Sequence, residues 1–478
     1  MGEEISHSQF SEDERSEFQK RLREETKLLM GLFQNHAFSD ENDIVGFEIE
    51  AWLTNENFIP MPENQKFLDQ LNNPLVVHEL SQFNFELNGY PQKLDGAPFS
   101  KMEQSLDQTW NQCRNQAQWM NGRALRVGIL PTLRDEMLKM EYASKLERYK
   151  ALNEQVLAAR GGRPIHLRIE GYDEVQSVHH DVMLEAAATS LQIHLQIPQN
   201  LAGRYYNAGV ICAAPMVALA ANSPYLFGRE LWDETRIPLF EQSIFINSFQ
   251  DVHGENISRV TLGTGYVRES LFELFLENLD GYPPLLPMVL TSEPERLGHL
   301  RLHNGTLWRW NRPLIGISDQ GEYHLRIEHR VTAAGPSLRD EVAHVALFKG
   351  LSDYMVEMEE PPELKLDFQT ARENFYDCCK MGLQAEITWI DGQRWNVQKL
   401  FHEWLLPKAA EALSKKGVSS QELQVYFEQT LKPRVLSGQN GAAWQKAYIA
   451  THGPDFQGMT EAYFQNQESG RPVHEWSV

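Results

Sequence analysis

The sequence predicts an α+β fold with a mostly antiparallel sheet, and the order of its strands and helices is the main evidence. From about residue 43 to residue 331, short alternating strands are interleaved with helical stretches in no regular order. A parallel sheet would require repeated strand–helix–strand units, which this order lacks. After Gly335-Pro336 the alternation largely stops, and the remaining pattern is helical up to a polar tail.

These changes of pattern predict three segments: an N-terminal helical segment over residues 1–42, a strand-rich domain over residues 43–335, and a C-terminal helical region over residues 336–478 that packs on the same unit. In the first segment, Ser11 and Glu14 have the spacing of a helix capping box. Four apolar residues then recur on one helical face: Phe18, Leu22, Leu29 and Phe33. Further helices are predicted over residues 106–126, 144–159, 338–358 and 397–416.

Bulk properties restrict the function. A chain of 478 residues, 42% of them hydrophobic and 23% charged, is expected to bury a large core. Its formal net charge of −22 argues against nucleic acids and anionic membranes as partners. A nucleotide ligand stays compatible with this charge, because local arginines and bound cations reverse the field inside a cleft.

The cysteines and the N-terminus predict a cytoplasmic protein. The four cysteines match no zinc pattern and include an adjacent pair, so reduced thiols are the simpler interpretation. The first residues lack the basic and apolar regions of a secretory signal. The apolar run over residues 208–221 contains Pro215 and is too short to span a bilayer, so it predicts a buried helix, broken or kinked near the proline.

The first strand with candidate functional groups is predicted over residues 45–53. Its apolar residues alternate with Glu48 and Glu50, whose side chains point to the opposite face about 7 Å apart. Two carboxylates at this spacing suit adjacent hard cations, which prefer oxygen ligands. For an isolated Glu-x-Glu, however, the solvated face of an edge strand is the more common explanation.

A second strand is predicted over residues 79–88, with Glu86 and Asn88 on its polar face. Glu79 is out of phase with Glu86 along a regular strand. Glu79 therefore reaches the same site only through a bulge or a loop.

The third strand, residues 191–198, alternates without a fault. It places Gln192 and His194 on its polar face. A histidine in this position is more often a surface group than a ligand, so the strand by itself does not decide between the two interpretations.

The fourth strand, residues 323–331, has a charged face that four side chains share: His324, Arg326, Glu328 and Arg330. A carboxylate between two arginines forms an ordinary ion-pair ladder, or it binds a metal beside cations that neutralise a transferred phosphoryl group. In the preceding segment, Asn-Gly at 304–305 predicts a hairpin turn. Arg312 and Trp308 follow it, and tryptophans at strand spacing are by default packing residues.

Taken together, the four polar faces are hard to explain as solvated surface. A pocket that gathers carboxylates needs cations, because like charges in a closed site disfavour ionisation. Magnesium or manganese that holds a triphosphate is the expected occupant. The phosphate cradle G-x-x-x-x-G-K-[ST] is absent, which excludes a P-loop enzyme.

In their order along the chain, these residues resemble the glutamate–cysteine ligase type 2 family, the carboxylate–amine ligases related to glutamine synthetase. Each matching piece is short, but the ordered set is specific and spans about residues 43 to 335. The pieces are Gly46-Phe-Glu-Ile-Glu50, Glu79 with Glu86-Leu-Asn88, Arg148-Tyr149, Ser190-Leu-Gln-Ile-His194, Asn222-Ser-Pro224, Gly305-Thr-Leu-Trp308 with Arg312-Pro313, and Arg326-Ile-Glu-His-Arg330. The resemblance makes residues 43–335 the expected ligase catalytic domain.

The resemblance implies a glutamine synthetase-like domain: a curved antiparallel sheet of about six strands, with helices on the convex side and the active site on the concave face. By motif, six residues match metal ligands: Glu48, Glu50, Glu79, Glu86, His194 and Glu328. Arg330 and Arg312 match catalytic arginines, and Arg330 is expected to meet the nucleotide's phosphate. Nucleotide or substrate contacts are expected from Gln192, Asn88, Trp308 and Arg326. Glutamine synthetases have a His-x-His element where this chain has Gln192 and His194. One metal ligand or nucleotide contact is therefore expected to differ from theirs.

The implied reaction uses ATP and Mg²⁺ or Mn²⁺. A carboxylate attacks the γ-phosphate of ATP, and an amine then displaces phosphate from the acyl phosphate, while the metals offset the charge. Glutamate is the expected carboxylate, and cysteine or another amine is the expected nucleophile, as in glutathione biosynthesis. A homo-oligomer is compatible with the resemblance.

Two alternatives stay open at this point. A phosphotransferase of the same fold would move phosphate to a guanidino or carboxylate group and stop. A catalytically inactive relative would bind nucleotide or metal as a regulatory protein. The presence of Glu48, Glu50, Glu328 and Arg330 argues against the inactive relative, which need not keep all four.

Overall fold

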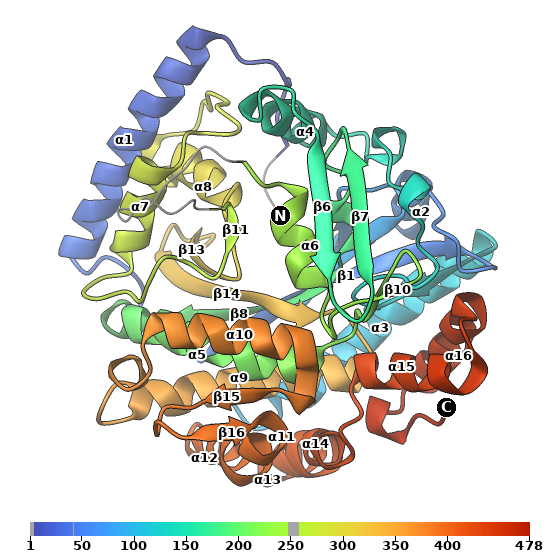
Figure 1. The fold of residues 1–478 in the computed structure, drawn as a ribbon. Coiled ribbons are helices and arrows are strands. Elements are labelled where there is room, and N and C mark those ends of the chain that lie inside the picture. Colours follow the sequence, from blue (N-terminus) through green and yellow to red (C-terminus); the bar gives the residue numbers. More distant parts are fainter. Residues whose placement is uncertain (1–3, 42, 247–257) are drawn as a thin grey trace.

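The centre of the molecule is an antiparallel sheet. The computed structural model describes residues 4–41, 43–246 and 258–478 (Figure 1). Six strands form one hydrogen-bonded path in the order β13 (Asn311–Ile317), β14 (Tyr323–Ala333), β8 (Ser190–Ile197), β1 (Ile44–Asn55), β3 (Asn84–Asn88) and β2 (Val76–His78). Two short strands, β4 (Gln92–Lys93) and β5 (Gly122–Leu125), also pair with β1. The predicted α+β class and the antiparallel sheet are confirmed.

Helices cover the apolar face of this sheet. Helix α5 (Ala202–Ala220) packs on β14, and α9 (Leu338–Glu357) packs on α5 and β8, with α10 (Phe368–Met381) behind α5 (Figure 1). The apolar side chains of β1 point toward this side and are all buried: Val45, Phe47, Ile49, Ala51 and Leu53. The buried helix expected over residues 208–221 is α5, but it continues through Pro215 without a break. A proline removes only one backbone hydrogen bond, and burial of nearly the whole helix outweighs that loss.

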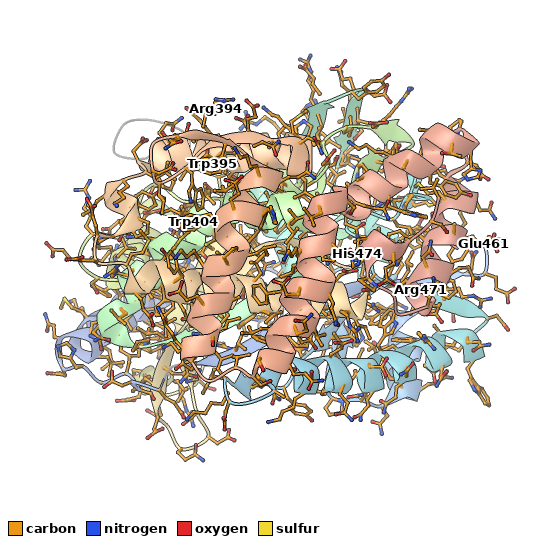
Figure 2. All side chains as sticks on the ribbon, turned by 90° about the horizontal axis from the view of Figure 1, so that it is seen from below. Arg394, Trp395, Trp404, Glu461, Arg471 and His474 are labelled. Carbon is orange, nitrogen blue, oxygen red and sulfur yellow. The ribbon has the colours of Figure 1, made fainter. Side chains whose placement is uncertain are left out.

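The C-terminal helices form a further layer beyond α9, and Figure 2 shows them lying across this side of the molecule. The predicted helix 397–416 is observed as α11 (Val397–Leu400), a π-helical segment with Trp404, and α12 (Leu406–Lys415). Farther on, α16 (Phe456–Glu468) is tied to the sheet domain through Asn222. The Asn222 side-chain amide donates hydrogen bonds to the Tyr463 hydroxyl and to the Ala334 carbonyl, at 2.8 and 2.7 Å. A single hydrophobic core includes residues of all three segments, such as Phe18, Ile193 and Trp444.

The N-terminal helix α1 (Glu12–Gln34) lies on the other side of the sheet from α5. Its capping box between Ser11 and Glu14 is present, and Phe18, Leu22, Leu29 and Phe33 are buried as predicted. The helix packs on α7 (Phe272–Gly281) and α8 (Gly298–Gly305) (Figure 1). The α4 helix (Glu147–Ala159) matches the helix predicted over residues 144–159. None of the helices in the described ranges has the length and apolar character that crossing a bilayer requires.

Two local predictions are wrong. The helix expected over residues 106–126 is observed as α3 (Pro98–Trp119) and is followed by β5. The helix ends early because Asn121 adopts a left-handed conformation and Gly122 packs tightly against the backbone of β1. The Asn-Gly at 304–305 does not form a hairpin but ends α8, where the buried Asn304 side chain donates a hydrogen bond to the Pro313 carbonyl. The hairpin lies instead between β13 and β14, where Gly321 takes the positive φ of the turn.

The strand predicted over residues 79–88 is shorter than expected. It begins only at Asn84, and Glu79 lies in the loop that joins β2 to β3. This loop removes the phase constraint that separated Glu79 from Glu86 in the sequence pattern. Glu79 thus reaches the same face as Glu86 through a loop, one of the two arrangements that the sequence pattern allowed.

Candidate active site

Strand pairing brings the polar side chains of distant segments side by side on the second face of the sheet. In the register of β1 and β3, Glu50 lies opposite Glu86. In the register of β14 and β8, Glu328 lies opposite His194. Cross-strand partners on one face are neighbours, so the four strands gather their carboxylates and the histidine in one region.

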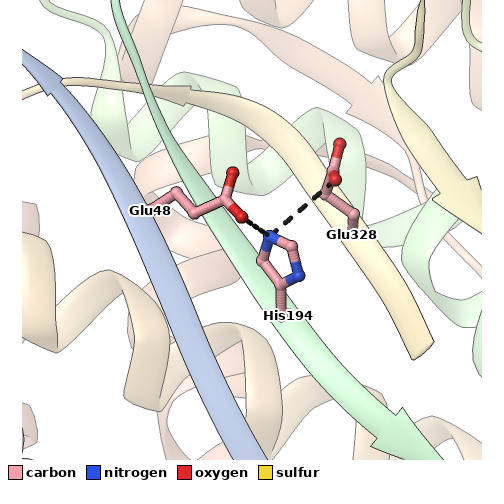
Figure 3. A group of neighbouring side chains, drawn as sticks. All are labelled: Glu48, His194 and Glu328. Carbon is pink, nitrogen blue, oxygen red and sulfur yellow. Dashed lines mark ion pairs between the residues drawn. The ribbon is translucent and has the colours of Figure 1, made fainter. Parts of the chain in front are cut away.

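One group, here called the Glu328 cluster, consists of Glu48, His194 and Glu328. One ligand atom from each lies within 4.8 Å of the others. His194 Nε2 is 3.4 Å from Glu48 Oε1 and 3.8 Å from Glu328 Oε2 (Figure 3). Neither ring nitrogen of His194 makes a hydrogen bond to the described residues. Burial lowers the pKa of His194, which favours the neutral imidazole that binds metals.

Two arginines neutralise the Glu328 cluster. Arg312 donates two hydrogen bonds to the Glu328 carboxylate, at 3.1 and 3.0 Å. Arg330 donates a third hydrogen bond to the Glu328 carboxylate, at 2.6 Å, and another to the side-chain oxygen of Gln192. Burial pushes the pKa of Glu328 upward, but the guanidinium groups of Arg312 and Arg330 outweigh it and hold this pKa well below its usual range. Glu328 is therefore ionised at any working pH.

A second group, here called the Glu86 cluster, consists of Glu50, Glu79 and Glu86, whose ligand atoms also lie within 4.8 Å of one another. Glu50 accepts hydrogen bonds from the Ser190 backbone at 2.6 Å and from the Gln192 side chain at 2.9 Å. Gln192 thus bridges the two clusters through its amide.

The Glu86 cluster has an excess of negative charge. Glu86 Oε1 accepts a hydrogen bond from Asn88 at 3.0 Å, while its Oε2 is buried without a hydrogen bond to the described residues. Burial and the neighbouring Glu50 raise the pKa of Glu79 to about 8. Burial and the neighbouring Glu48 raise the pKa of Glu86 well above its ordinary value. These carboxylates ionise together only when a cation joins them.

The donor sets fit divalent metals. The Glu86 cluster offers three carboxylates, including a buried oxygen without a partner, and the Glu328 cluster offers two carboxylates and an unpartnered imidazole. Oxygen-rich sites of this kind suit magnesium or manganese. All six residues predicted as metal ligands thus fall into two groups on one sheet face, although their ligand role stays a prediction.

The other predicted site residues differ in position. Arg326 faces Glu48 and Glu328, and its Nε is buried without a hydrogen bond to the described part of the chain. Burial lowers the pKa of Arg326 by more than the nearby Glu48 and Glu328 raise it. Trp308 lies on β12 (Trp308–Arg309), half-buried against Phe240, and belongs to neither cluster.

Sequence reasoning missed several charged residues of this region, Glu185 and Arg301 among them. Glu185 begins a short 3₁₀ segment before β8, and burial together with Glu50 raises its pKa to about 8. Arg301 is exposed on α8 and lies close enough to Arg326 to lower the pKa of that guanidinium. Both lie outside the alternating strands, so no periodic signal marked them. The small residues around Glu185 were the only local sign of a tight turn.

Comparison with known proteins agrees with this geometry. The model of the glutamate-cysteine ligase family 2 matches residues 44–467. A glutamate–cysteine ligase from Francisella tularensis, solved in complex with AMP, superposes with a TM-score of 0.53 at 12% identity over 91% of this chain and 90% of that one. A bifunctional glutathione synthetase from Pasteurella multocida gives a TM-score of 0.56 at 11% identity over 93% of this chain and 54% of that one. At such identities the likeness concerns the fold, and it confirms the curved antiparallel sheet with helices on its convex side. No curated protein sequence matches this chain.

Proposed function

Because this chain belongs to the glutamate-cysteine ligase family 2, a family of carboxylate–amine ligases, we propose that it uses ATP to join the γ-carboxylate of glutamate to an amine. The observation that carries the proposal is the pair of clusters, two groups of metal-binding side chains that meet on one face of the sheet. A single acidic cluster would serve a structural ion equally well. Two clusters bridged by Gln192 and flanked by arginines suit a polyphosphate and a carboxylate held side by side.

The proposed metal ligands follow the two clusters. Glu48, His194 and Glu328 would hold one divalent cation, and the three carboxylates of the Glu86 cluster would hold a second. A divalent cation held by these residues would offset the repulsion between ATP and an incoming carboxylate. Asn88 orients Glu86 by its hydrogen bond and is thereby a positioning residue.

The arginines of the site have separate tasks in this proposal. Arg312 pairs with Glu328 in a two-point contact that fixes the carboxylate in its ionised form. Arg330 also contacts Glu328, but its Nε has no hydrogen bond to the described residues and is available to a phosphoryl oxygen. Arg326, with its own unpartnered Nε, is placed to bind a second phosphate oxygen.

The reaction proceeds in two steps. A glutamate γ-carboxylate oxygen forms a bond to the γ-phosphorus, and the bond to ADP breaks with its electron pair on the departing oxygen. The amine nitrogen then bonds to the acyl carbon, inorganic phosphate leaves with the electron pair of the broken C–O bond, and the nitrogen loses a proton. Arg330 and Arg326 stabilise the charge on the transferred phosphoryl group in the first step.

The substrates and the setting complete the proposal. Glutamate and cysteine are the substrates in the name of the family, and the Francisella structure was solved with AMP, which supports a nucleotide in the same fold. Residues 43–335 form the catalytic domain, and the segments 1–42 and 336–478 brace it. We place the reaction in the cytoplasm, since all four cysteines are buried free thiols.

A hydroxylamine trap tests the proposal. The purified protein is incubated with ATP, Mg²⁺ and L-glutamate, with and without hydroxylamine, and both phosphate and hydroxamate are measured. We expect glutamate-dependent phosphate release and γ-glutamyl hydroxamate. A phosphorylated guanidino compound without hydroxamate would identify a phosphotransferase instead, and no phosphate release with any amino acid or amine would identify an inactive binding protein.

A further inference from the structure

Glu185 is a carboxylate beside the Glu86 cluster that the proposed reaction does not use. It begins the 3₁₀ segment Glu185–Ala187, which leads into β8. The proposed metal ligand on that strand, His194, follows a few residues later. Within the described ranges, its side chain has neither a hydrogen bond nor an ion pair. Glu185 is half-buried, so its carboxylate faces a partly dry site in which a cationic ligand would be favoured.

This carboxylate lines a cavity with one aromatic side and one charged side. The free space beside it, open solvent at the mouth included, is about 260 Å³, and its walls include Glu50, Phe240, Trp310 and Arg330. Glu185 also lines a second, adjoining cavity with Glu79, so it stands between the Glu86 cluster and the aromatic wall. A ligand in the first cavity therefore lies directly beside a proposed metal-binding carboxylate.

The aromatic wall is held in place. Phe240 and Trp310 contact each other edge to face, with ring centroids 5.7 Å apart at 71°. Trp310 is fully buried, and its indole nitrogen donates a hydrogen bond to Glu241 at 2.9 Å. These side chains offer no oxygen ligands to a metal, but aromatic faces do attract organic cations.

The cations that border the cavity are already engaged. Arg236 pairs with Glu234 at 2.9 Å and donates hydrogen bonds to the backbone carbonyls of Arg330 and Val331. Arg330 contacts Glu328 and Gln192. Arg330 attracts the Glu185 carboxylate without forming an ion pair with it, so a cationic ligand can supply a direct partner.

We propose that Glu185 binds the ammonium group of a substrate in this cavity. The proposal rests on the proposed function, because it places a substrate amino group beside the site of acyl transfer. A primary ammonium has three donors, which Glu185 and the neighbouring Glu50 can share, and its carbon chain lies against Phe240 and Trp310. The interior itself has room for a group about the size of a water molecule, which an ammonium group matches, while the rest of the substrate would occupy the open mouth. Two substrates carry this chemistry: the amine nucleophile and the α-ammonium of glutamate.

Binding of matched ligand pairs tests the proposal without relying on turnover. Calorimetric titrations of the full chain with Mg²⁺ and a non-hydrolysable ATP analogue compare L-glutamate with glutarate, and L-cysteine with 3-mercaptopropionate. Each pair differs by one amino group. We expect Glu185→Gln to weaken binding of the amino member of one pair by about 10- to 100-fold, the effect of losing a hydrogen bond between charged groups. Binding of both deaminated members should not change.

The pair that responds identifies the source of the ammonium. A loss confined to the cysteine pair assigns the cavity to the nucleophile, and a loss confined to the glutamate pair assigns it to the α-ammonium. Glu185→Asp, which keeps the charge, should retain the preference for the amino member. Glu141→Gln is a matched control, because Glu141 is an exposed residue in another 3₁₀ segment.

The proposal is overturned if Glu185→Gln binds all four ligands like the wild-type protein, or if it weakens both members of a pair equally. Failure of the proposed function has a different signature. In that case the wild-type protein forms no hydroxamate, while amino-selective binding and its loss in Glu185→Gln are still measurable. A melting curve of each variant confirms that the compared proteins are folded.

Discussion

The Glu328 cluster and the Glu86 cluster lie on the same sheet face but balance their charge in different ways. In the Glu328 cluster, Arg312 and Arg330 surround the central carboxylate and keep its pKa low. In the Glu86 cluster, burial and the neighbouring carboxylates outweigh the nearby positive charges, Arg148 among them, and the pKa values of Glu79 and Glu86 are raised. The first cluster is a preorganised, ionised site, whereas the second becomes fully charged only together with a cation.

This difference assigns separate physical roles to the two halves of the site. A carboxylate held by arginines keeps its geometry whether or not a metal is bound, so the Glu328 cluster provides a fixed frame for phosphate. A group of carboxylates whose burial outweighs the nearby positive charge couples its ionisation to metal binding, so the Glu86 cluster responds to metal and pH. Four experiments test this distinction.

The largest effect is expected when each cluster loses one carboxylate. The double variant Glu48→Gln with Glu50→Gln should lose magnesium-dependent turnover while it stays folded, because glutamine preserves shape but not charge. The two single variants show whether both clusters are needed. Phosphate release measured across a magnesium titration is the readout, and wild-type turnover in the double variant would rule out the Glu-x-Glu site. Glu63→Gln, at an exposed position, is the control.

Arg330→Lys tests the preorganised half of the site. A lysine keeps the charge but loses the planar fork that contacts Glu328 and a phosphoryl oxygen together. We expect kcat to fall by about 10²–10³-fold, the range seen when one donor to a developing charge is removed, with a smaller change in the KM for ATP. Steady-state kinetics beside a melting curve distinguish this from a structural ion pair. An active but destabilised variant would contradict the catalytic role.

Neutralising one carboxylate in each cluster should change the stability of the metal-free protein in opposite directions. Glu328→Gln removes the carboxylate that pairs with the buried Arg330 and the half-buried Arg312, and we expect a loss of about 3–5 kcal/mol. Glu86→Gln removes a carboxylate that burial and Glu48 already disfavour, and we expect a gain of about 1–3 kcal/mol at neutral pH. Denaturant unfolding in the presence of a chelator measures both. Changes of the same sign would show that the two clusters do not differ in charge balance.

The smallest effect concerns pH. The pKa of Glu79 is raised to about 8 in the folded protein. The contribution of protonated Glu79 to the free energy of unfolding is therefore complete below pH 4.5 and is lost as the pH rises through 8. Magnesium must displace this proton, so affinity for the metal should rise with pH up to about 8, by about tenfold per pH unit for one displaced proton. Calorimetry in two buffers of different ionisation enthalpy measures the protons released. Magnesium binding at pH 7 without proton release would contradict the assignment of Glu79 as a ligand.

Strand alternation accounts for most of what could be predicted about the site. In β1 and β8 the period of two assigned Glu48, Glu50 and His194 to one face, and the structure has these faces as expected. The prediction failed where the backbone leaves the regular period. Glu185 lies in an irregular segment, and Asn304 has a turn-forming neighbour but is held in a helix by tertiary hydrogen bonds.

The sequence by itself determined which side chains share a face of each strand, because the alternation of a pleated strand is a local property of its backbone. Only the tertiary structure decided how these residues group. Glu48 and Glu50 are two positions apart on β1, yet Glu48 joins His194 and Glu328, whereas Glu50 joins Glu79 and Glu86. The reason is that β8 with β14 and β3 with β2 flank β1 on opposite sides, and pairing between strands far apart in sequence sets both the ligand groups and their pKa values.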